Sequence, residues 1–354
     1  MALALSLGRR GMGRVWPIPA VGGVLVNDGR IVGRGHTADG GRPHAETAAL
    51  AQAGVAAAGG TAYVTLEPCA HHGKTPPCAQ SLIDAQIARV VVGTGDPDDR
   101  VAGKGIAMLQ AAGIAVTENV LCDQAKADHA GVLLRITQNR PFVTLKLAGT
   151  LDGRIATATG ESQWITGPAA RRAVHMMRAR HDAVMVGAGT VRADDPSLTV
   201  RGLGIHKQPV RVVVSRNLRL PLDCQLAATT DQAPVWLCHG PNSQVGAWVK
   251  CGALSLPCRL IAGQVDPMSV MASLASAVIT RVFCEGGGML AAALLQADLV
   301  DELVVVSAGL AIGAEGTPAL AAMGIDRLDN APRFNLKQVQ QIGADICHTW
   351  QKKI

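Results

Sequence analysis

Short apolar runs alternate with amphipathic segments along the first part of the chain. The runs at 21–26 and 31–35 flank the turn Asn27–Gly29, and an Asp-Gly turn between two apolar runs predicts a β-hairpin. The same patterning predicts further strands at 61–66 and 89–92, and helices at 45–58, 78–85 and 106–112. This alternation predicts a three-layer α/β domain.

The alternation continues after a polar, amphipathic helix expected at 123–137. Strands are expected at 142–147, 183–187, 210–214, 235–237, 259–261, 281–284 and 302–307, and helices at 169–180, 267–278 and 288–295. Residues 338–343 are short loop or strand material without a clear pattern. The change near Gln138–Pro141 predicts two α/β domains, 1–139 and 140–354, in agreement with a length of 354 residues.

Composition narrows the class of protein. Apolar residues make up 48% of the chain and charged residues 17%, which suits a folded core and excludes global disorder. No apolar run approaches the length of a membrane-spanning helix, so no transmembrane helix is expected. Residues 1–139 carry 12 basic against 11 acidic residues, and the whole chain has nine aromatics. Such a chain suits a small anionic substrate better than a nucleic acid.

Nine cysteines are an odd number, and the apolar N-terminal stretch precedes its basic residues, the reverse of a secretory signal. Reduced thiols in a cytoplasmic protein are therefore expected. Seven of the nine show no motif spacing and are interpreted as packing residues: Cys122, Cys224, Cys238, Cys251, Cys258, Cys284 and Cys347.

The strongest chemical pattern combines His44, Glu46, Cys69 and Cys78. One imidazole and two thiolates leave one tetrahedral zinc position for water, which is typical of a catalytic zinc site. Glu46 follows His44 by two residues at a helix start and is the candidate proton carrier, matching the H-x-E and P-C pattern of zinc deaminases. Eight residues separate the two cysteines, where that pattern has two. The alternative is a structural zinc site completed by His71 or His72.

The run Leu66–Cys78 resembles the deaminase half of the bifunctional deaminase/reductase family of riboflavin biosynthesis. The segments Arg42–Glu46 and Val101–Gly105 are similar to that family too. The resemblance implies a cytidine-deaminase-like α/β/α domain at 1–139. It also implies zinc-dependent deamination of 2,5-diamino-6-(5-phosphoribosylamino)pyrimidin-4-one.

One position departs from the family pattern. The family has Pro-Asn-Pro where this chain reads Pro17-Ile18-Pro19, and an isoleucine side chain cannot hydrogen-bond a pyrimidine. One alternative is therefore a reductase whose deaminase domain is impaired by Ile18. A second alternative is a zinc deaminase that acts on nucleic acid, since related enzymes act on flipped bases.

Two glycine-containing segments in the second half suit an anion. Gly187 and Gly189 follow an apolar strand, although a lone G-x-G is equally typical of a tight turn. The strand at 281–284 runs into Glu285–Gly288 at a helix start, where backbone amides point at a ligand. This second segment is the better candidate for an anion cradle.

The segments Thr144–Lys146, Thr150–Arg154, Ser162–Thr166, Val186–Thr190 and Asp194–Arg201 resemble the reductase half of the same family. The resemblance implies a dihydrofolate-reductase-like α/β domain at 140–354 that uses NADPH to reduce the ribosyl group to ribityl, in a homo-oligomer. Carried over by position, the substrate-binding residues are Ser162, Arg178, Leu198, Arg201 and Glu285. The cofactor-binding residues are Ala148, Trp164, Thr190, Asp194, Gly287, Gly288, Met289, Leu290, Ala291, Ala292 and Ala293. Lys146 and Asp152 are further candidates for the reductase site.

Overall fold

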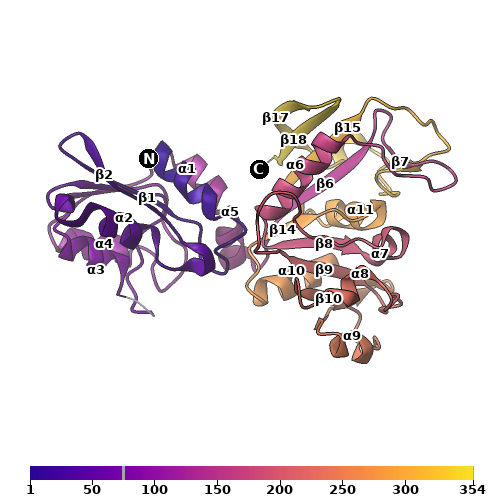
Figure 1. The fold of residues 1–354 in the computed structure, drawn as a ribbon, viewed down its shortest axis with the longest axis horizontal. Helices are drawn as coiled ribbons and strands as arrows, with labels where there is room; N and C mark the ends of the chain where they lie inside the picture. Colours follow the sequence, from indigo (N-terminus) through magenta and orange to yellow (C-terminus); the bar gives the residue numbers. More distant parts are fainter. Residues whose placement is uncertain (74–75, 354) are drawn as a thin grey trace. The chain divides into compact units, whose positions relative to one another are not determined.

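The computed structural model describes residues 1–73 and 76–353 and divides the chain into two units, Met1–Arg140 and Pro141–Ile354 (Figure 1). Lys74 and Thr75, which belong to the run that resembles the deaminase family, lie outside the described residues. Each unit has its own sheet and core, so the two are described separately.

The first unit is built on a five-stranded sheet with the strand order β2-β1-β3-β4-β5. Strand β1 pairs antiparallel with β2 and β3, whereas β3, β4 and β5 are parallel. The hairpin turn has positive φ at Asp28 and Gly29, as the Asp-Gly pair predicts. The strands are β1 (Gly22–Asn27), β2 (Arg30–His36), β3 (Thr61–Val64), β4 (Arg89–Val92) and β5 (Ala115–Thr117).

Helices cover both faces of this sheet. On one face, Leu25 and Val64 pack in one apolar cluster with residues of three helices, among them Leu82 and Leu109. On the other face, Val24 packs against Leu7. The helices of the first face are α2 (Ala45–Ala53), α3 (Cys78–Asp84) and α4 (Lys104–Ala111); those of the second are α1 (Ala2–Gly8) and α5 (Cys122–Gln138). The prediction of a three-layer α/β domain is confirmed.

The predicted helix at 45–58 is too long. The α-helix ends at Ala53, and Gly54 has φ 53° and ψ −136°, a conformation that breaks the helical path. A short 3₁₀ turn, Gly54–Ala57, follows. Glycine adopts positive φ without a steric penalty, so Gly54 ends the helix where an alanine-rich pattern alone continues it. The predicted strand at 61–66 likewise ends earlier, at Val64.

The second unit contains a nine-stranded sheet with the order β11-β10-β9-β8-β14-β6-β15-β18-β17. The strands from β11 to β15 in this order are parallel, and β18 and β17 form an antiparallel edge. The strands are β6 (Phe142–Thr150), β8 (Ala183–Gly187), β9 (Val210–Ser215), β10 (Val235–His239), β11 (Leu254–Pro257), β14 (Arg281–Cys284), β15 (Glu302–Ala308), β17 (Phe334–Ile342) and β18 (Asp345–Lys352). Two small antiparallel pairs join β12 (Leu260–Ile261) to β13 (Gln264–Val265) and β7 (Arg154–Ala156) to β16 (Thr317–Pro318).

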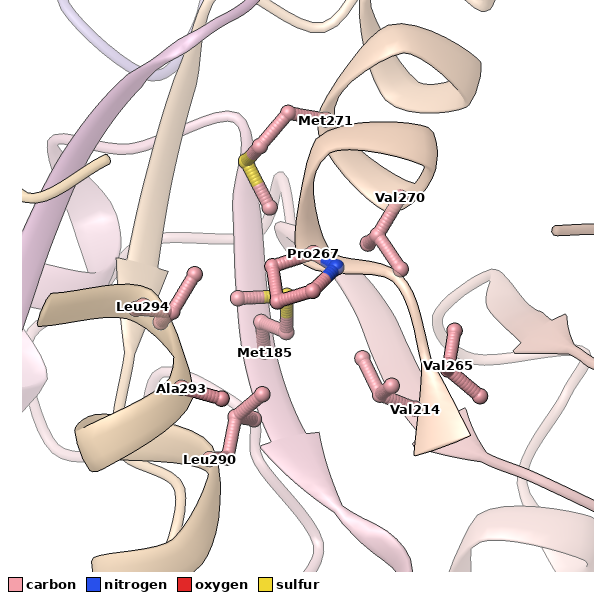
Figure 2. A pocket seen from close by; sticks show the side chains of 9 residues that line it. All are labelled: Met185, Val214, Val265, Pro267, Val270, Met271, Leu290, Ala293 and Leu294. Carbon is pink, nitrogen blue, oxygen red and sulfur yellow. The ribbon is translucent and has the colours of Figure 1, made fainter. Parts of the chain in front are cut away.

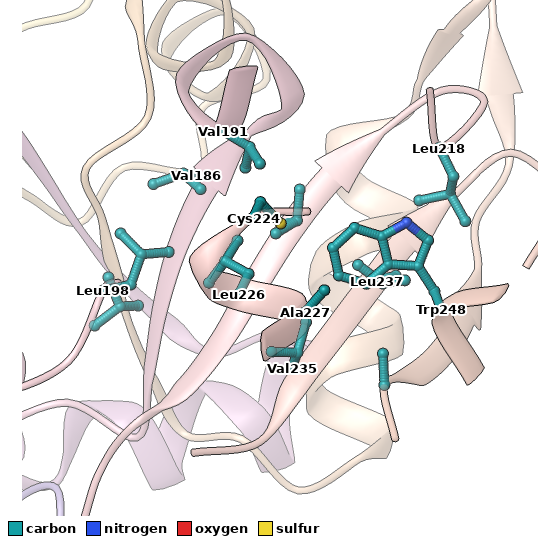
Figure 3. Close-up of a cluster of buried hydrophobic side chains, with 13 residues drawn as sticks. Val186, Val191, Leu198, Leu218, Cys224, Leu226, Ala227, Val235, Leu237 and Trp248 are labelled. Atoms are coloured by element: carbon teal, nitrogen blue, oxygen red, sulfur yellow. The ribbon is translucent and has the colours of Figure 1, made fainter. Parts of the chain in front are cut away.

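The central strands of this sheet are buried on both faces. On one face, Val186 and Leu237 pack with Leu226 and Trp248 (Figure 3). On the other, Met185 lines a small apolar cavity of about 30 Å³ between the sheet and two helices (Figure 2). The helices of this unit are α6 (Pro168–Ala179), α7 (Ala188–Asp194), α8 (Gln225–Ala228), α9 (Gly246–Lys250), α10 (Pro267–Ser276) and α11 (Gly288–Gln296). Burial on both faces is why these parallel strands read as continuous apolar runs.

Two predictions for the second unit need correction. The strand expected at 259–261 is a two-residue piece, Leu260–Ile261, that pairs only with β13 and does not join the main sheet. The segment 338–343, which the sequence leaves open between loop and strand, belongs up to Ile342 to the edge strand β17. Nearly every side chain of β17 is exposed, so the strand shows no apolar period along the sequence. Within the described ranges 1–73 and 76–353, no helix combines the length and apolar character needed to span a membrane.

Candidate active sites

Three sequence-predicted metal ligands of the first unit lie together. His44 immediately precedes α2, Cys69 lies in the loop after β3, and Cys78 is the first residue of α3. His44 Nδ1 is 3.3 Å from Cys78 Sγ and 3.8 Å from Cys69 Sγ. All three ligand atoms lie within 4.8 Å of one another. Two helix starts and one loop therefore bring nitrogen and sulfur donors to one point.

The electrostatics of this cluster suit a cation. The hydrogen bond with the Cys78 side chain lowers the pKa of Cys69 to about 4, and the same hydrogen bond raises the pKa of Cys78. The Cys78 backbone N–H also donates to Cys69 Sγ at 3.3 Å. Two sulfurs next to an imidazole are a donor set that fits Zn²⁺, because the cation binds thiolates and a neutral imidazole. Three donors leave a fourth tetrahedral position open.

Glu46 lies beside the cluster but is not one of its ligands. It stands in the first turn of α2 and is only 4% exposed. Burial raises the pKa of Glu46, and its carboxylate shares a hydrogen bond with Cys78. A carboxyl group in this position can exchange protons with a molecule bound at the open metal position.

The structural-zinc alternative lacks its fourth ligand. Both His71 and His72 are described, and neither belongs to the group of ligand atoms that lie within 4.8 Å of one another. Since a closed structural site needs four protein ligands, the geometry favours the open arrangement.

Glu67 is a residue of this site that the sequence interpretation missed. Its buried carboxylate accepts backbone N–H groups from Gly103 at 3.1 Å, Gly105 at 3.0 Å and Ile106 at 3.3 Å. A Cβ on Gly105 would lie 1.9 Å from the Pro68 carbonyl oxygen, so only glycine fits there. Glu67 thus ties the start of α4 to the loop that carries Cys69. The sequence signal was a charged residue directly after an apolar strand.

In the second unit, Arg178 and Glu285 form a largely buried ion pair. Arg178 Nε and Nη2 donate to the two carboxylate oxygens at 2.5 and 3.1 Å, and Nη1 donates to the Thr199 carbonyl at 2.9 Å. Burial alone would raise the pKa of Glu285, but Arg178 and Lys146 hold it below its ordinary value. Burial also lowers the pKa of Lys146. The sheet therefore brings together three charged candidates from α6, β6 and the end of β14.

Two of the predicted cofactor-binding residues also meet. The Gly287 N–H donates to Thr190 Oγ1 at 3.2 Å, which joins α7 to the loop before α11. A Cβ on Gly286 would lie 2.7 Å from Leu290 Cδ2, and one on Gly288 would lie 3.1 Å from the Ala321 N atom. Glycines at these positions let the start of α11 pack closely against its neighbours, and the start of a helix is a favourable place for an anion.

The remaining predicted residues of the reductase site have varied surroundings. Trp164 is 69% exposed, with the Arg171 guanidinium 4.4 Å from its ring centroid. Leu198 is 2% exposed and packs in the cluster with Val186 (Figure 3), so its side chain contributes to the core. The other members differ in exposure: Ala148 and Ser162 are half-buried, and Asp194, Arg201 and Met289 are exposed.

Asp152 anchors a loop. Its carboxylate accepts the backbone N–H groups of Ile312 and Gly313, at 3.2 and 2.7 Å, and the Thr150 hydroxyl at 2.5 Å. These hydrogen bonds, the one from Thr150 first, lower the pKa of Asp152 to about 2. The contacts give Asp152 a clear role in holding the loop after β15 against the end of β6.

The fold and the two sites define a class of protein. The family model for the zinc-binding region of cytidine and deoxycytidylate deaminases matches residues 1–94, and that for the RibD C-terminal domain matches residues 141–348. The chain is thus an enzyme that joins a zinc-binding deaminase domain to a reductase domain.

Similarity to known proteins extends over the whole chain. The riboflavin biosynthesis protein RibD of Escherichia coli is 41% identical over 98% of this chain and 97% of its own length. The Haemophilus influenzae RibD is 42% identical over 100% and 96%. A solved structure of Acinetobacter baumannii RibD superimposes with a TM-score of 0.90 at 37% identity, covering 100% of this chain and 98% of that one. The chain belongs to the RibD family of bifunctional riboflavin biosynthesis enzymes. Neither the reductase with an impaired deaminase domain nor the deaminase that acts on nucleic acid is favoured.

Proposed function

We propose that this enzyme catalyses two successive steps on one phosphoribosyl pyrimidine. Residues 1–139 would deaminate 2,5-diamino-6-(5-phosphoribosylamino)pyrimidin-4-one. Residues 140–354 would then reduce the ribosyl group and yield 5-amino-6-(5-phosphoribitylamino)uracil. A similar protein of Thermotoga maritima, 33% identical with a TM-score of 0.86, is a diaminohydroxyphosphoribosylaminopyrimidine deaminase/5-amino-6-(5-phosphoribosylamino)uracil reductase. The observation that carries the proposal is the His44–Cys69–Cys78 cluster with Glu46 buried beside it.

In the deamination step, His44 Nδ1 and the Cys69 and Cys78 sulfurs would hold one zinc ion per chain. Zinc bound there supplies Lewis acidity that makes a water molecule nucleophilic near neutral pH. Glu46 takes a proton from the attacking water and delivers it to the departing amino group. The ring carbon gains an oxo oxygen and loses ammonia, so atoms and charge balance.

In the reduction step, Ser162, Arg178, Leu198, Arg201 and Glu285 would bind the substrate. A guanidinium presents paired donors that match phosphate oxygens, which suits Arg178 and Arg201 to this ligand. NADPH supplies the hydride, and the protein supplies orientation and charge. Its binding residues in this proposal are Ala148, Trp164, Thr190, Asp194 and the segment from Gly287 to Ala293, and the glycine-rich start of α11, which the Gly287 N–H joins to Thr190, supports that placement.

The proposal also covers assembly and location. We expect a homo-oligomer in the cytoplasm that acts on a small molecule and binds neither nucleic acid nor membrane. None of the nine cysteines, all of which are described, forms a disulfide, which supports a reducing compartment. The near balance of charge in residues 1–139 supports a site for a small substrate rather than a nucleic-acid surface.

The test separates the two steps. Zinc-loaded enzyme is given the diaminopyrimidinone without NADPH and ammonia release is measured; NADPH is then added and its absorbance followed. Ammonia release followed by NADPH consumption supports both activities. If no ammonia appears but NADPH is consumed with the deaminated uracil compound, the deaminase half of the proposal is wrong. Replacing Ile18 with Asn would then show whether that position is responsible.

A further inference from the structure

The segment from Thr199 to Arg201, which carries one of the proposed substrate-binding arginines, is held by α6. Arg178 donates to the Thr199 carbonyl oxygen at 2.9 Å. One turn earlier on the same helix face, His175 Nδ1 lies 3.1 Å from that carbonyl oxygen and 3.3 Å from the backbone nitrogen of Arg201. His175 is absent from the family-derived set of site residues, yet it is the side chain that contacts the Arg201 backbone.

The two contacts of His175 Nδ1 exclude one another. When Nδ1 carries no proton, its lone pair accepts the Arg201 N–H; when Nδ1 is protonated, it can only donate to the Thr199 carbonyl oxygen. That carbonyl already accepts a hydrogen bond from Arg178. The state that holds Arg201 is therefore the neutral imidazole with its proton on Nε2.

The charges around His175 favour the neutral ring. Burial lowers its pKa, and Arg178 on α6 and Arg201 on the facing segment lower it further, which outweighs the opposing effects of the Thr199 carbonyl and of the Glu285 charge at the end of β14. The Arg201 side chain is exposed and has no hydrogen bond or ion pair to any residue in 1–73 or 76–353. It is thus free to bind an anion, provided that its backbone is fixed.

We propose that His175 is a positioning residue for substrate binding in the reductase domain: its neutral imidazole fixes the Arg201 backbone so that the guanidinium meets the substrate phosphate. This inference rests on the proposed role of Arg201. It predicts that His175 acts on substrate affinity and leaves hydride transfer unchanged, because the ring touches the segment and not the reacting atoms.

Kinetics of two variants test this role. His175→Leu removes the acceptor, and we expect KM for the deaminated uracil substrate to rise roughly fivefold, the factor that one net hydrogen bond carries, with kcat changed less than about twofold. His175→Gln keeps an acceptor oxygen and should restore KM to within about twofold of wild type. His206→Leu, an exposed histidine of the same unit, is the matched control and should leave KM unchanged. Equal KM in all variants, or a loss of kcat alone, would overturn the inference.

The pH dependence of KM is a second test, because the proposal fixes the direction of the change. As the pH falls from about 6.5 towards 4.5, protonation of His175 removes the acceptor, so the KM of wild type should rise relative to that of His175→Gln. Titration of the substrate phosphate affects both enzymes equally and cancels in the ratio. A ratio that stays constant or falls on acidification contradicts the proposal.

A measurement without substrate keeps this inference separate from the proposed function. Amide hydrogen exchange at the Thr199–Arg201 segment should be faster in His175→Leu than in wild type, and unchanged in His206→Leu. If wild type fails to reduce the uracil compound, the proposed function fails while the exchange result still decides whether His175 holds the segment. Unchanged exchange in His175→Leu would overturn the positioning role directly.

Discussion

The two candidate sites of this enzyme are constructed in different ways. The metal cluster draws His44, Cys69 and Cys78 from one short stretch of chain, and its donors are small side chains at helix starts and in a loop. The reductase site joins Arg178 of α6 to Glu285 after β14, 107 positions apart. It is made of long, charged side chains that neutralise one another in a largely buried place.

This difference predicts different responses to mutation. In the metal cluster, each ligand serves a bound cation, so a lost ligand should remove metal and activity with little effect on the other unit. In the reductase site, the partners serve each other, so a lost partner leaves a buried, uncompensated charge and should lower the stability of the second unit itself.

The largest effect is expected for Cys78→Ser. Because changes that only support metal ligands already cost about 10–100-fold in metal affinity, loss of a ligand should lower zinc affinity by more than about 100-fold and abolish ammonia release. Zinc content by elemental analysis and both activities are measured. Cys122→Ser, a thiol outside the cluster, is the control. NADPH oxidation by Cys78→Ser should remain at the wild-type level. Full zinc content in this variant would contradict the assignment of Cys78 as a metal ligand.

Glu46→Gln should reduce kcat for deamination by roughly 10²–10⁴-fold, since the amide cannot carry a proton. Zinc content should be unchanged, because the carboxylate is not among the three ligands. The matched control is Glu118→Gln at an exposed position. Loss of zinc together with activity would instead indicate that Glu46 is a metal ligand, and its assignment as the proton carrier would be wrong.

Arg178→Met should destabilise the second unit by about 3–5 kcal/mol, the usual result of removing one partner of a buried ion pair. Urea denaturation measures this change. The double variant Arg178→Met, Glu285→Gln should recover part of the loss, because the Glu285 side chain then carries no charge and Lys146 is the remaining charged member of the group. Arg327→Met, whose ion pair with Asp329 is exposed, should cost less than about 1 kcal/mol. If Arg178→Met and Arg327→Met lower the free energy of unfolding by similar amounts, the Arg178–Glu285 pair does not stabilise the second unit in the way proposed.

A smaller effect is expected from pH in the second unit. His181 is buried, and burial lowers its pKa to about 4, below its value of about 6.5 in the unfolded chain. Between pH ~4 and pH ~6.5 the unfolded state therefore binds more protons than the folded state. The contribution of the neutral His181 to stability is complete above pH ~6.5 and is lost as the pH falls towards 4. It amounts to roughly 3 kcal/mol.

Urea midpoints at pH 7 and pH 4.5 test this contribution. His181→Gln should lose less stability on acidification than wild type, and the exposed His206→Gln should behave as wild type. The same acid dependence in His181→Gln and wild type would show that other groups carry the effect.

Much of the fold could be read from local patterns. The strand at Arg281–Cys284 and the parallel strands around it are buried on both faces and appear as apolar runs. The exposed strand β17 has no such period and stayed unassigned, and Gly54 ended a helix that its alanines favoured. The apolar pattern therefore predicted the strands that are buried. It did not predict elements whose ends or type depend on one backbone conformation or on pairing within the sheet.

The chemistry of the metal site follows from local sequence alone. His44, Glu46, Cys69 and Cys78 have short spacings, and their identities alone restrict what they can bind. Tertiary structure decided the rest. Pairing of β14 with β6 and β8 placed Glu285 beside Arg178 and Lys146, and the return of the chain against α6 placed Arg201 on His175. Contacts between residues far apart in the chain depend on strand order and burial, which no local spacing records.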